Sequence, residues 1–363
     1  MNNRLRGRAK WRGLAVGAAV LLVLGVAVPA SAHNGPPPRI TETDQVSDQA
    51  GKAKLTDPSL VNAWGLALSP TSPLWVANNG TDTATLYAGG LGGATVTKAG
   101  LTVNVAGNPT GQVFNGGTDF VVTGSGGGSG PARFIFDTES GDILGWNPTA
   151  NPNTALLGAH VDGAVFKGLA IDNTTFGSFL LAADFHHGTI DVFDGKFRQI
   201  PLPPEIFFHD PKLPKGYAPF NVMVSGDKVY VSYAKQDQVA HDEIDGAGLG
   251  FVDVYTNFGV TVHRLASRGS LNAPWGMAFA PDSWGTLAGD LLVGNFGDGR
   301  INAFNGDDFD GQLRGADGKP LDIDGLWSLL PGTANTGGVG TIWFSAGPDG
   351  EMHGLLGQLT PAS

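Results

Sequence analysis

The sequence predicts an all-β protein built from six copies of one four-stranded unit. Three observations lead to this prediction: the apolar runs are short, turn residues separate them, and one pattern recurs along the chain. The clearest copy spans residues 272–306, where PDSWGTLAGD and GDG separate three strand signals. Two other segments, 76–87 and 182–193, align with residues 293–304 without a gap.

One residue near the start of each first predicted strand sets the period of the repeat. These residues are Gly65, Gly111, Gly168, Asn221, Gly276 and Ser328. Their spacings are 46, 57, 53, 55 and 52 residues, near the roughly 40 to 50 residues of a propeller blade. A helical repeat would need apolar residues about 3.6 positions apart, and the sequence shows no such spacing. We therefore expect a six-bladed β-propeller over residues 45–361.

The two ends of the chain are predicted to complete the same blade. The last repeat supplies three strand signals before the C-terminus, in WSLLPG, TIWFSAG and MHGLLGQL. Residues 43–48 precede the first repeat and supply a fourth strand. Such a blade closes the ring and removes the open sheet edge that would otherwise pair with other chains.

The first 32 residues have the three parts of a secretory signal. Basic residues from Arg4 to Arg12 precede an apolar run, Gly13 to Val28, and then the small-residue sequence Ala30-Ser31-Ala32. Cleavage there would leave a Pro-rich spacer, residues 33–44, before the propeller. We expect a protein exported across the cytoplasmic membrane, to the periplasm or the medium. Retention as a membrane anchor is the alternative, and it leaves the propeller on the same side.

Composition excludes several partners and site types. Residues 1–32 hold five basic residues and no acidic one, so their removal takes the formal net charge from −11 to −16. Nucleic acids and anionic lipids need a basic face, so neither is an expected partner. The chain has no Cys, which excludes disulfides and thiolate metal sites. We expect a monomer with no membrane contact beyond the signal segment.

Several segments resemble NHL-type repeats, in which a second strand ends in Asn or Asp and a short polar loop follows. They include GLALSPTSPLWVANNGTDTATLY and GMAFAPDSWGTLAGDLLVGNFGDGRINAF. From Gln45 onward the chain is also similar to an uncharacterised family of exported bacterial six-bladed propellers. The matching stretches are LVNAWGLALSP, PTGQVFN, YAPFNV, YAKQD, LDIDGLW and GPDGEMHGLLG. The resemblance implies the fold and carries no assigned activity.

Candidate site residues lie where first strands start and second strands end, because both places meet at the mouth of the central channel. The first-strand starts contribute Asn62, Asn108, Lys167, Asn221 and Asn272, and the second-strand ends contribute Asn78, Asp184, Tyr233 and Asn295. Asn and Asp also bond turn backbones, and this structural role is the alternative for each of them.

Two long insertions are expected at the same face. Residues 234–248 contain Lys235, Asp237, His241 and Asp242. Residues 201–219 are rich in Pro and contain Phe207 and Phe208, which we expect to be exposed. Long loops without regular structure are uncommon unless they are functional or disordered. A lid or partner-docking edge and a solvated excursion remain equal alternatives.

The pair His186-His187 is weak evidence for a metal site, because adjacent side chains of an extended segment point to opposite faces. One of them, placed near Asp184, would form an acid–base pair. A polar turn is the favoured alternative, since the equivalent residues elsewhere are Gly297-Asp298. The sequence contains no Gly-x-Ser-x-Gly, HExxH or P-loop motif.

Two functions follow as hypotheses, and whether the protein is an enzyme stays open. The first is a non-catalytic binding or scaffold propeller whose rim takes a protein, glycan or small-molecule ligand. The second is a metal-dependent hydrolase similar to gluconolactonases and paraoxonases, which hold a divalent cation with Asn, Asp and Glu oxygens. That resemblance implies Ca²⁺ or a similar cation at Asn78, Asp184, Asn221 and Asn295. No Glu sits at a matching rim position, which counts against the hydrolase.

Overall fold

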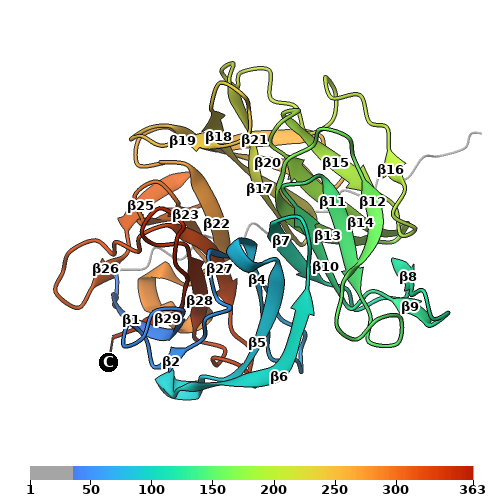
Figure 1. The fold of residues 1–363 in the computed structure, drawn as a ribbon. Helices are drawn as coiled ribbons and strands as arrows, with labels where there is room; N and C mark the ends of the chain where they lie inside the picture. The colour runs from blue at the N-terminus through green and yellow to red at the C-terminus, as the bar shows by residue number, and fades with distance from the viewer. Residues whose placement is uncertain (1–35, 363) are drawn as a thin grey trace, which may run out of the picture. The chain divides into compact units, whose positions relative to one another are not determined.

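A computed structural model describes residues 36–362 of the chain (Figure 1). The predicted signal segment lies outside these residues. The described part forms six antiparallel sheets of at least four strands each, and a short separate hairpin. The first strand of each sheet contacts the first strand of the next, and the first strand of sheet six contacts that of sheet one. This ring confirms the predicted six-bladed β-propeller.

The blades follow the chain in order. Blade one contains β3 (Ala63–Ala67), β4 (Leu74–Asn78), β5 (Thr83–Gly89) and β6 (Val96–Asn104), and blade two β7 (Pro109–Phe114), β10 (Phe134–Thr138), β11 (Asp142–Trp146) and β12 (Leu156–His160). Blade three contains β13 (Phe166–Thr174), β14 (Gly177–Asp184), β15 (Thr189–Phe193) and β16 (Gln199–Ile200). Blade four contains β17 (Tyr217–Ser225), β18 (Lys228–Gln236), β20 (Gly250–Thr256) and β21 (Thr261–Ser267), with β19 (Glu243–Ile244) paired to β18.

Blade five contains β22 (Pro274–Phe279), β23 (Leu291–Asn295), β24 (Ile301–Asn305) and β25 (Asp308–Gln312). Blade six contains β27 (Leu326–Pro331), β28 (Ile342–Ala346), β29 (Leu355–Pro361) and β1 (Arg39–Ser47), with the short strands β2 (Leu55–Thr56) and β26 (Arg314–Gly315) beside β1. The separate hairpin is β8 (Val121–Thr123) and β9 (Ser129–Pro131), and the 3₁₀ turns are η1 (Asn79–Thr81), η2 (Leu91–Gly93) and η3 (Asp282–Leu287).

The six residues that set the predicted period all lie in first strands. Each follows its strand's first residue by two positions, or by four in blade four. Close packing between neighbouring first strands explains the glycines among them. A Cβ on Gly65 would lie 2.4 Å from Thr110 O, and one on Gly111 would lie 2.2 Å from Leu169 N. Larger residues would therefore force adjacent blades apart.

Strand β1 closes the ring as the fourth strand of blade six. It runs antiparallel to β29, with Ile40 opposite Pro361 and Ser47 opposite Leu355. Ile40 and Val46 are both buried. The strand begins at Arg39, so it takes in half of the segment expected to be a spacer. The apolar side chain of Ile40 accounts for this, because it packs into the core beside blade six.

The core consists of apolar clusters between neighbouring blades, and one aromatic cluster lies at the start of the first strands. Trp64 and Trp327 stack with ring centroids 3.5 Å apart, and Trp275 meets both edge-on. Trp275 also lines a channel cavity of about 290 Å³, to which all six first strands contribute. Within residues 36–362, no helix has the length and apolar character needed to cross a membrane.

Candidate binding site at the channel mouth

The start of each first strand lies beside the end of the second strand of the same blade, as expected. Ala63 pairs with Asn78, Phe166 with Asp184, and Pro274 with Asn295. Polar residues from different blades therefore gather at one end of the channel. The aromatic cluster lies directly beneath them, because Trp327 Nε1 donates to Asn62 Oδ1 and Trp275 Nε1 donates to Lys167 O.

Lys167, near the start of β13, is the centre of this mouth. Its side chain is buried although it is charged, with only 1% of the residue exposed. Its Nζ lies 2.5 Å from Glu139 Oε1 and 3.3 Å from Asp242 Oδ1. The ammonium also lies 5.3 Å from the centre of the Trp64 ring, within the range of a cation–π contact. Residues from blades one, two, three and four thus fix one buried cation.

A chain of hydrogen bonds through side-chain amide groups extends this contact across the mouth. Asn79 Nδ2 donates to Glu139 Oε2 at 3.0 Å, and Asn62 Nδ2 donates to Asn79 Oδ1 at 3.2 Å. Asn62 Nδ2 also donates to Glu351 Oε2 of blade six at 2.6 Å. Asn62 has a positive φ of 47°, a conformation that Asn adopts more readily than most residues. Asn62 therefore suits both the backbone conformation required here and the side-chain hydrogen bonds to Asn79 and Glu351.

The charges of the mouth shift the pKa values of its members in opposite directions. Burial acts to lower the pKa of Lys167, but the charges of Glu139 and Glu243 outweigh it, so the pKa lies above its usual value. Burial acts to raise the pKa of Asp242, but the Lys167 charge and the His241 hydrogen bond bring it below its usual value. Lys167 and Asp242 are thus both charged at neutral pH.

Two glutamates of the mouth have raised pKa values, unlike Asp242. Burial raises the pKa of Glu243 to about 7, opposed by the Lys167 charge and assisted by the charges of Glu351 and Asp245. Burial also raises the pKa of Glu351, against a hydrogen bond from Asn62. Carboxyl groups whose pKa burial raises beside a specific charged partner are typical of functional sites.

No Glu lies at the second-strand ends that match Asn78, Asp184 and Asn295, because these positions are Thr138 in blade two and Ala346 in blade six. Glutamates reach the mouth from other positions. We call Lys167, Glu139, Asp242, Glu243 and Glu351 the mouth cluster, and three of its five members are Glu. Glu139 directly follows β10 and Glu351 follows β28, the second strands of blades two and six. Glu139 takes the position that Asn79 takes after β4, whereas Glu351 lies in the loop five residues past the end of β28. The repeat pattern marks the strand ends themselves, so it indicates neither Glu139 nor Glu351.

The four residues expected to hold a metal do not form one ligand set. Asn78 donates to Thr83 and Thr85, Asp184 accepts from the backbone and ring of His187, and Asn295 bonds Asp298 and Asn302. Asn221 donates to Trp275 O. Within residues 36–362 no hydrogen bond joins any two of the four. Asn78 and Asp184 bond residues around their own strand ends, and Asn295 also donates to Ser270 O in the connection from blade four at 2.8 Å, so a local structural role describes these three.

Three other predicted mouth residues have structural contacts. Asn108 Nδ2 donates to Asn79 O at 3.3 Å, next to the mouth cluster. Asn272 Oδ1 accepts from Gly246 N at 2.7 Å and so holds the base of an insertion. Tyr233 points away from the mouth into the core, where its hydroxyl lies 2.6 Å from that of Tyr255. Alternation along β18 explains this, because neighbouring residues face opposite sides of the sheet.

The insertion after β18 lies at the mouth through its second half. His241 Nδ1 lies 2.8 Å from Asp242 Oδ1, which in turn contacts Lys167. Asp237 caps the insertion by accepting from His241 N, and Lys235 pairs through its backbone with Tyr217. His186 Nδ1 lies 3.3 Å from Ala240 O of the same insertion. His187, and not His186, bonds Asp184.

Among the described residues, one group has the spacing of a metal site: Glu139, His241 and Asp242 offer ligand atoms within 4.8 Å of one another. Carboxylate and imidazole ligands suit several divalent cations. The Lys167 ammonium, however, already contacts both carboxylates. A bound metal would therefore have to compete with the charge of Lys167, which counts against a tight metal site.

Comparisons with known proteins identify relatives but no activity. No family model matches the chain. Uncharacterized protein R648 of Acanthamoeba polyphaga mimivirus is 36% identical over 326 residues, 86% of this chain and 78% of that protein. Uncharacterized protein L690 of the same virus is 35% identical over 326 residues, 86% of this chain and 84% of that protein. The chain belongs to their family. Since these members are viral, they give no support to the predicted bacterial, exported family.

Solved structures are similar to this chain in fold alone. A protein of unknown function from Bacteroides thetaiotaomicron aligns with a TM-score of 0.55 and 12% identity, over 88% of this chain and 75% of that one. A gluconolactonase from Xanthomonas campestris aligns with a TM-score of 0.40 and 14% identity, over 63% of this chain and 82% of that one. At these identities the chemistry of the site must be argued from its own residues.

Proposed function

We propose that the protein is a non-catalytic binding propeller that captures a positively charged group of its ligand at the channel mouth. The observation that carries this proposal is the mouth cluster itself, in which four acidic residues surround one lysine. Lys167 contacts two carboxylates, Glu139 and Asp242, and its single positive charge can offset only one of them. The Lys167 charge acts to lower the pKa values of Glu243 and Glu351, but neither forms a salt bridge with Lys167 within residues 36–362.

The charge and rigidity of the site both favour a cationic ligand. The whole chain has a formal net charge of −11, so its long-range field attracts cations toward the mouth. Blades one, two, three, four and six hold the polar groups in place, so binding would order few side chains. An ammonium or guanidinium group would replace the water that Glu243 and Glu351 lose on burial, through charge-assisted hydrogen bonds.

The proposal includes the place where the protein works. The secretory pattern of residues 1–32 supports export across the cytoplasmic membrane of a bacterium. N-terminal sequencing of protein recovered outside the cytoplasm tests this part. A chain that begins at His33 agrees with export, and a chain retained in the cytoplasm with residues 1–32 intact contradicts it.

A titration with putrescine tests the binding function. Its matched control is 1,4-butanediol, which has the same carbon chain and hydroxyl groups in place of the two ammonium groups. We expect heat of binding for putrescine alone, weakened by added salt because the attraction is electrostatic. The variant E243Q should bind putrescine roughly tenfold more weakly, equivalent to about 1.4 kcal/mol. D308N, which alters an exposed acid in β25, should bind normally.

Three outcomes contradict this function. Putrescine and 1,4-butanediol bind alike, or neither binds at millimolar concentration, or E243Q and D308N lose the same affinity. The last result would show that only the overall negative charge attracts putrescine.

A second candidate, a metal-dependent hydrolase, is favoured by the spacing of Glu139, His241 and Asp242. Here the cation would polarise a lactone or ester carbonyl. Metal analysis of protein purified without chelator tests it. About one Ca²⁺ or similar ion per chain, with a melting temperature that falls on adding EDTA, would favour the hydrolase. A metal-free protein whose melting ignores both EDTA and Ca²⁺ removes it.

A further inference from the structure

The gap between blades three and four is filled in an unusual way. The fourth strand of blade three, β16, has two residues, whereas β6 and β21 have nine and seven. Pro201, Pro203 and Pro204 follow β16 directly. Proline has no backbone N–H to donate, so the strand cannot continue as part of the sheet. The Pro-rich segment 201–216 fills the gap where the missing length of strand would lie.

This segment is anchored on blade four and divides the gap. Phe208 N donates to Gly259 O at 2.7 Å, and Thr261 Oγ1 donates to His209 O at 2.7 Å. Phe208 is only 8% exposed and packs on Tyr255, with ring centroids 5.5 Å apart. The expectation that Phe208 is exposed is therefore wrong. Two chambers result, and they share Ile200, Leu202, Phe207 and Phe208 as lining residues.

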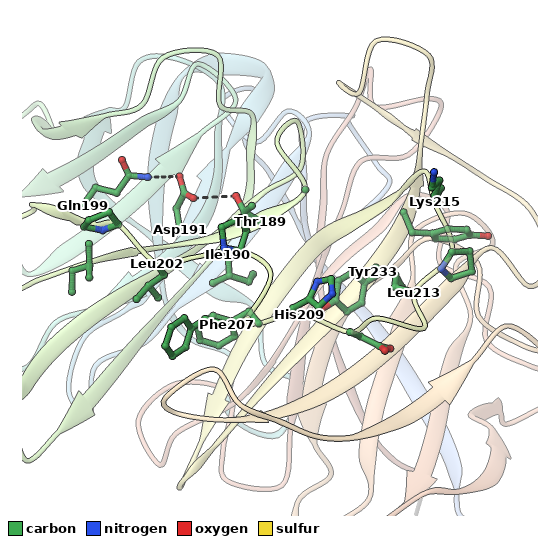
Figure 2. Close-up of a pocket in the computed structure, with 18 residues that line it drawn as sticks. Thr189, Ile190, Asp191, Gln199, Leu202, Phe207, His209, Leu213, Lys215 and Tyr233 are labelled. Atoms are coloured by element: carbon green, nitrogen blue, oxygen red, sulfur yellow. Dashed lines mark hydrogen bonds between the residues drawn. The ribbon is translucent and has the colours of Figure 1, made fainter.

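The first chamber, of about 330 Å³, is polar (Figure 2). Its Asp191 accepts hydrogen bonds from Thr189 Oγ1 at 3.1 Å and Gln199 Nε2 at 2.9 Å, as Figure 2 shows. Both carboxylate oxygens of Asp191 thus have a partner on the protein. This chamber provides a contrast for the second one.

The second chamber, of about 290 Å³, is lined mostly by apolar side chains. At its opening, the Phe176 and Phe258 rings stand edge to face with centroids 6.4 Å apart. These residues are 78% and 63% exposed, although aromatic side chains of this size are usually buried. A dry apolar cavity of about 150 Å³ is enough to hold benzene. The second chamber therefore has room for one ring with a short side chain.

One charged residue, Asp172, lies among the lining residues of the second chamber within the described chain. It is only 3% exposed, and burial raises the pKa of its carboxyl group. Within residues 36–362 its side chain has one hydrogen bond, a long one of 3.3 Å from Asn257 Nδ2. A buried carboxylate is costly unless hydrogen bonds or an opposite charge compensate it. Asp172 has less such compensation than Asp191, which accepts a hydrogen bond on each oxygen.

We propose that the second chamber binds a small aromatic amine, with its ring among the phenylalanines and its ammonium group at Asp172. Charge complementarity identifies the occupant. A neutral apolar molecule would leave Asp172 as poorly compensated as before, and an anion would be repelled by it. This site lies in the gap between blades three and four and is distinct from the mouth cluster.

Phenethylamine is a suitable probe, and 2-phenylethanol and phenylacetate are its neutral and anionic counterparts. Titration of the full chain, followed by protein NMR or calorimetry, should show phenethylamine binding at least tenfold more tightly than 2-phenylethanol. Phenylacetate should show no binding. Equal affinity for phenethylamine and 2-phenylethanol would overturn the proposal and would identify a neutral apolar site instead.

Two variants locate the binding. D172N should lower phenethylamine affinity to that of 2-phenylethanol, because the charge is lost and the shape is kept. F176S should weaken both ligands several-fold, whereas F309S, a matched change at the half-exposed Phe309 of β25, should leave them unchanged. Loss of phenethylamine binding in E243Q, with D172N unaffected, would overturn the proposal and assign the amine to the mouth cluster.

Discussion

The two insertions of blade four are held on the propeller by different forces. Residues 201–216 pack through Phe207 and Phe208 between two blades, and they bond to Gly259 O in the turn before β21 and to the Thr261 side chain of β21. Residues 237–248 reach across the mouth and contact it through charges, chiefly Asp242 with Lys167. One insertion therefore substitutes for a missing strand in the core. The other places titratable groups on a surface that a ligand can reach.

This difference indicates which insertion carries stability and which carries recognition. The stabilisation from apolar burial depends little on salt and pH. Ion pairs near the surface are weakened when salt screens the charges or when a pH change neutralises one partner. Changes in the apolar insertion should lower the free energy of unfolding under all conditions. Changes in the charged insertion should have smaller effects that depend on salt and pH.

Loss of ring closure should destabilise the protein more than a change in either insertion. Deleting residues 39–47 removes β1, its pairing with β29 and the buried side chains of Ile40 and Val46. The open blade would expose a full strand edge. We expect the largest loss of all, seen as unfolding or aggregation at 25 °C by circular dichroism and light scattering. A melting temperature equal to that of the intact chain would contradict the closure.

F208A should have the next largest effect. Truncating a buried Phe typically costs about 3–5 kcal/mol, because transfer free energy and a cavity both contribute. Urea unfolding should show this loss equally at low and high salt. The exposed F309S variant is the control and should change stability by less than about 0.5 kcal/mol. A salt-dependent loss in F208A would contradict the apolar account of this insertion.

K167M should destabilise the protein less than F208A does. Removing one partner of a fully buried ion pair costs about 3–5 kcal/mol. Glu139 and Asp242 are both partly exposed and can recover water, so we expect about 1–3 kcal/mol. The loss should shrink at 1 M salt, and putrescine affinity should rise because a competing positive charge is gone. Weaker putrescine binding in K167M would show that Lys167 itself helps to hold the ligand.

The last effect is a change of slope and concerns the pH dependence of stability. The folded-state pKa of Glu243 is about 7, above the roughly 4.3 of an unfolded Glu. Between these values the folded state binds more protons, so the free energy of unfolding falls as pH rises through this window. E243Q should flatten that slope by at most about 1.4 kcal/mol per pH unit, the value for one proton. D308N should leave the slope unchanged, and an unchanged slope in E243Q would contradict the burial of Glu243.

Much of the fold could be predicted from the repeats. Gly65, Gly111 and Gly168 mark first strands because only Gly fits where neighbouring blades approach this closely. Ring closure could be predicted as well, since the last repeat lacks one strand and residues 43–48 offer it. The start of β1 at Arg39 was missed, because the Pro-rich composition before it favours a spacer over a strand.

The mouth could be predicted only in part. Lys167, Asn62 and His241 were found from blade geometry, and they lie in or beside the mouth cluster. Glu139 and Glu351 were missed because they are far apart in the sequence and meet only when the ring closes. Asn78 and Asn295 were expected to face a ligand, but their amides bond their own turns. A repeated Asn therefore indicates the fold more strongly than it indicates a site.

The most direct test of the binding function is the putrescine affinity of the full chain at pH 6 and at pH 8. A cation binds best to an ionised Glu243, and a carboxyl group with a pKa of about 7 is mostly protonated at pH 6 and mostly ionised at pH 8. We therefore predict affinity roughly tenfold higher at pH 8, with E243Q weak at both pH values. Affinity that is equal at the two pH values, or matched by 1,4-butanediol, would contradict the proposal that the mouth cluster captures a positive charge.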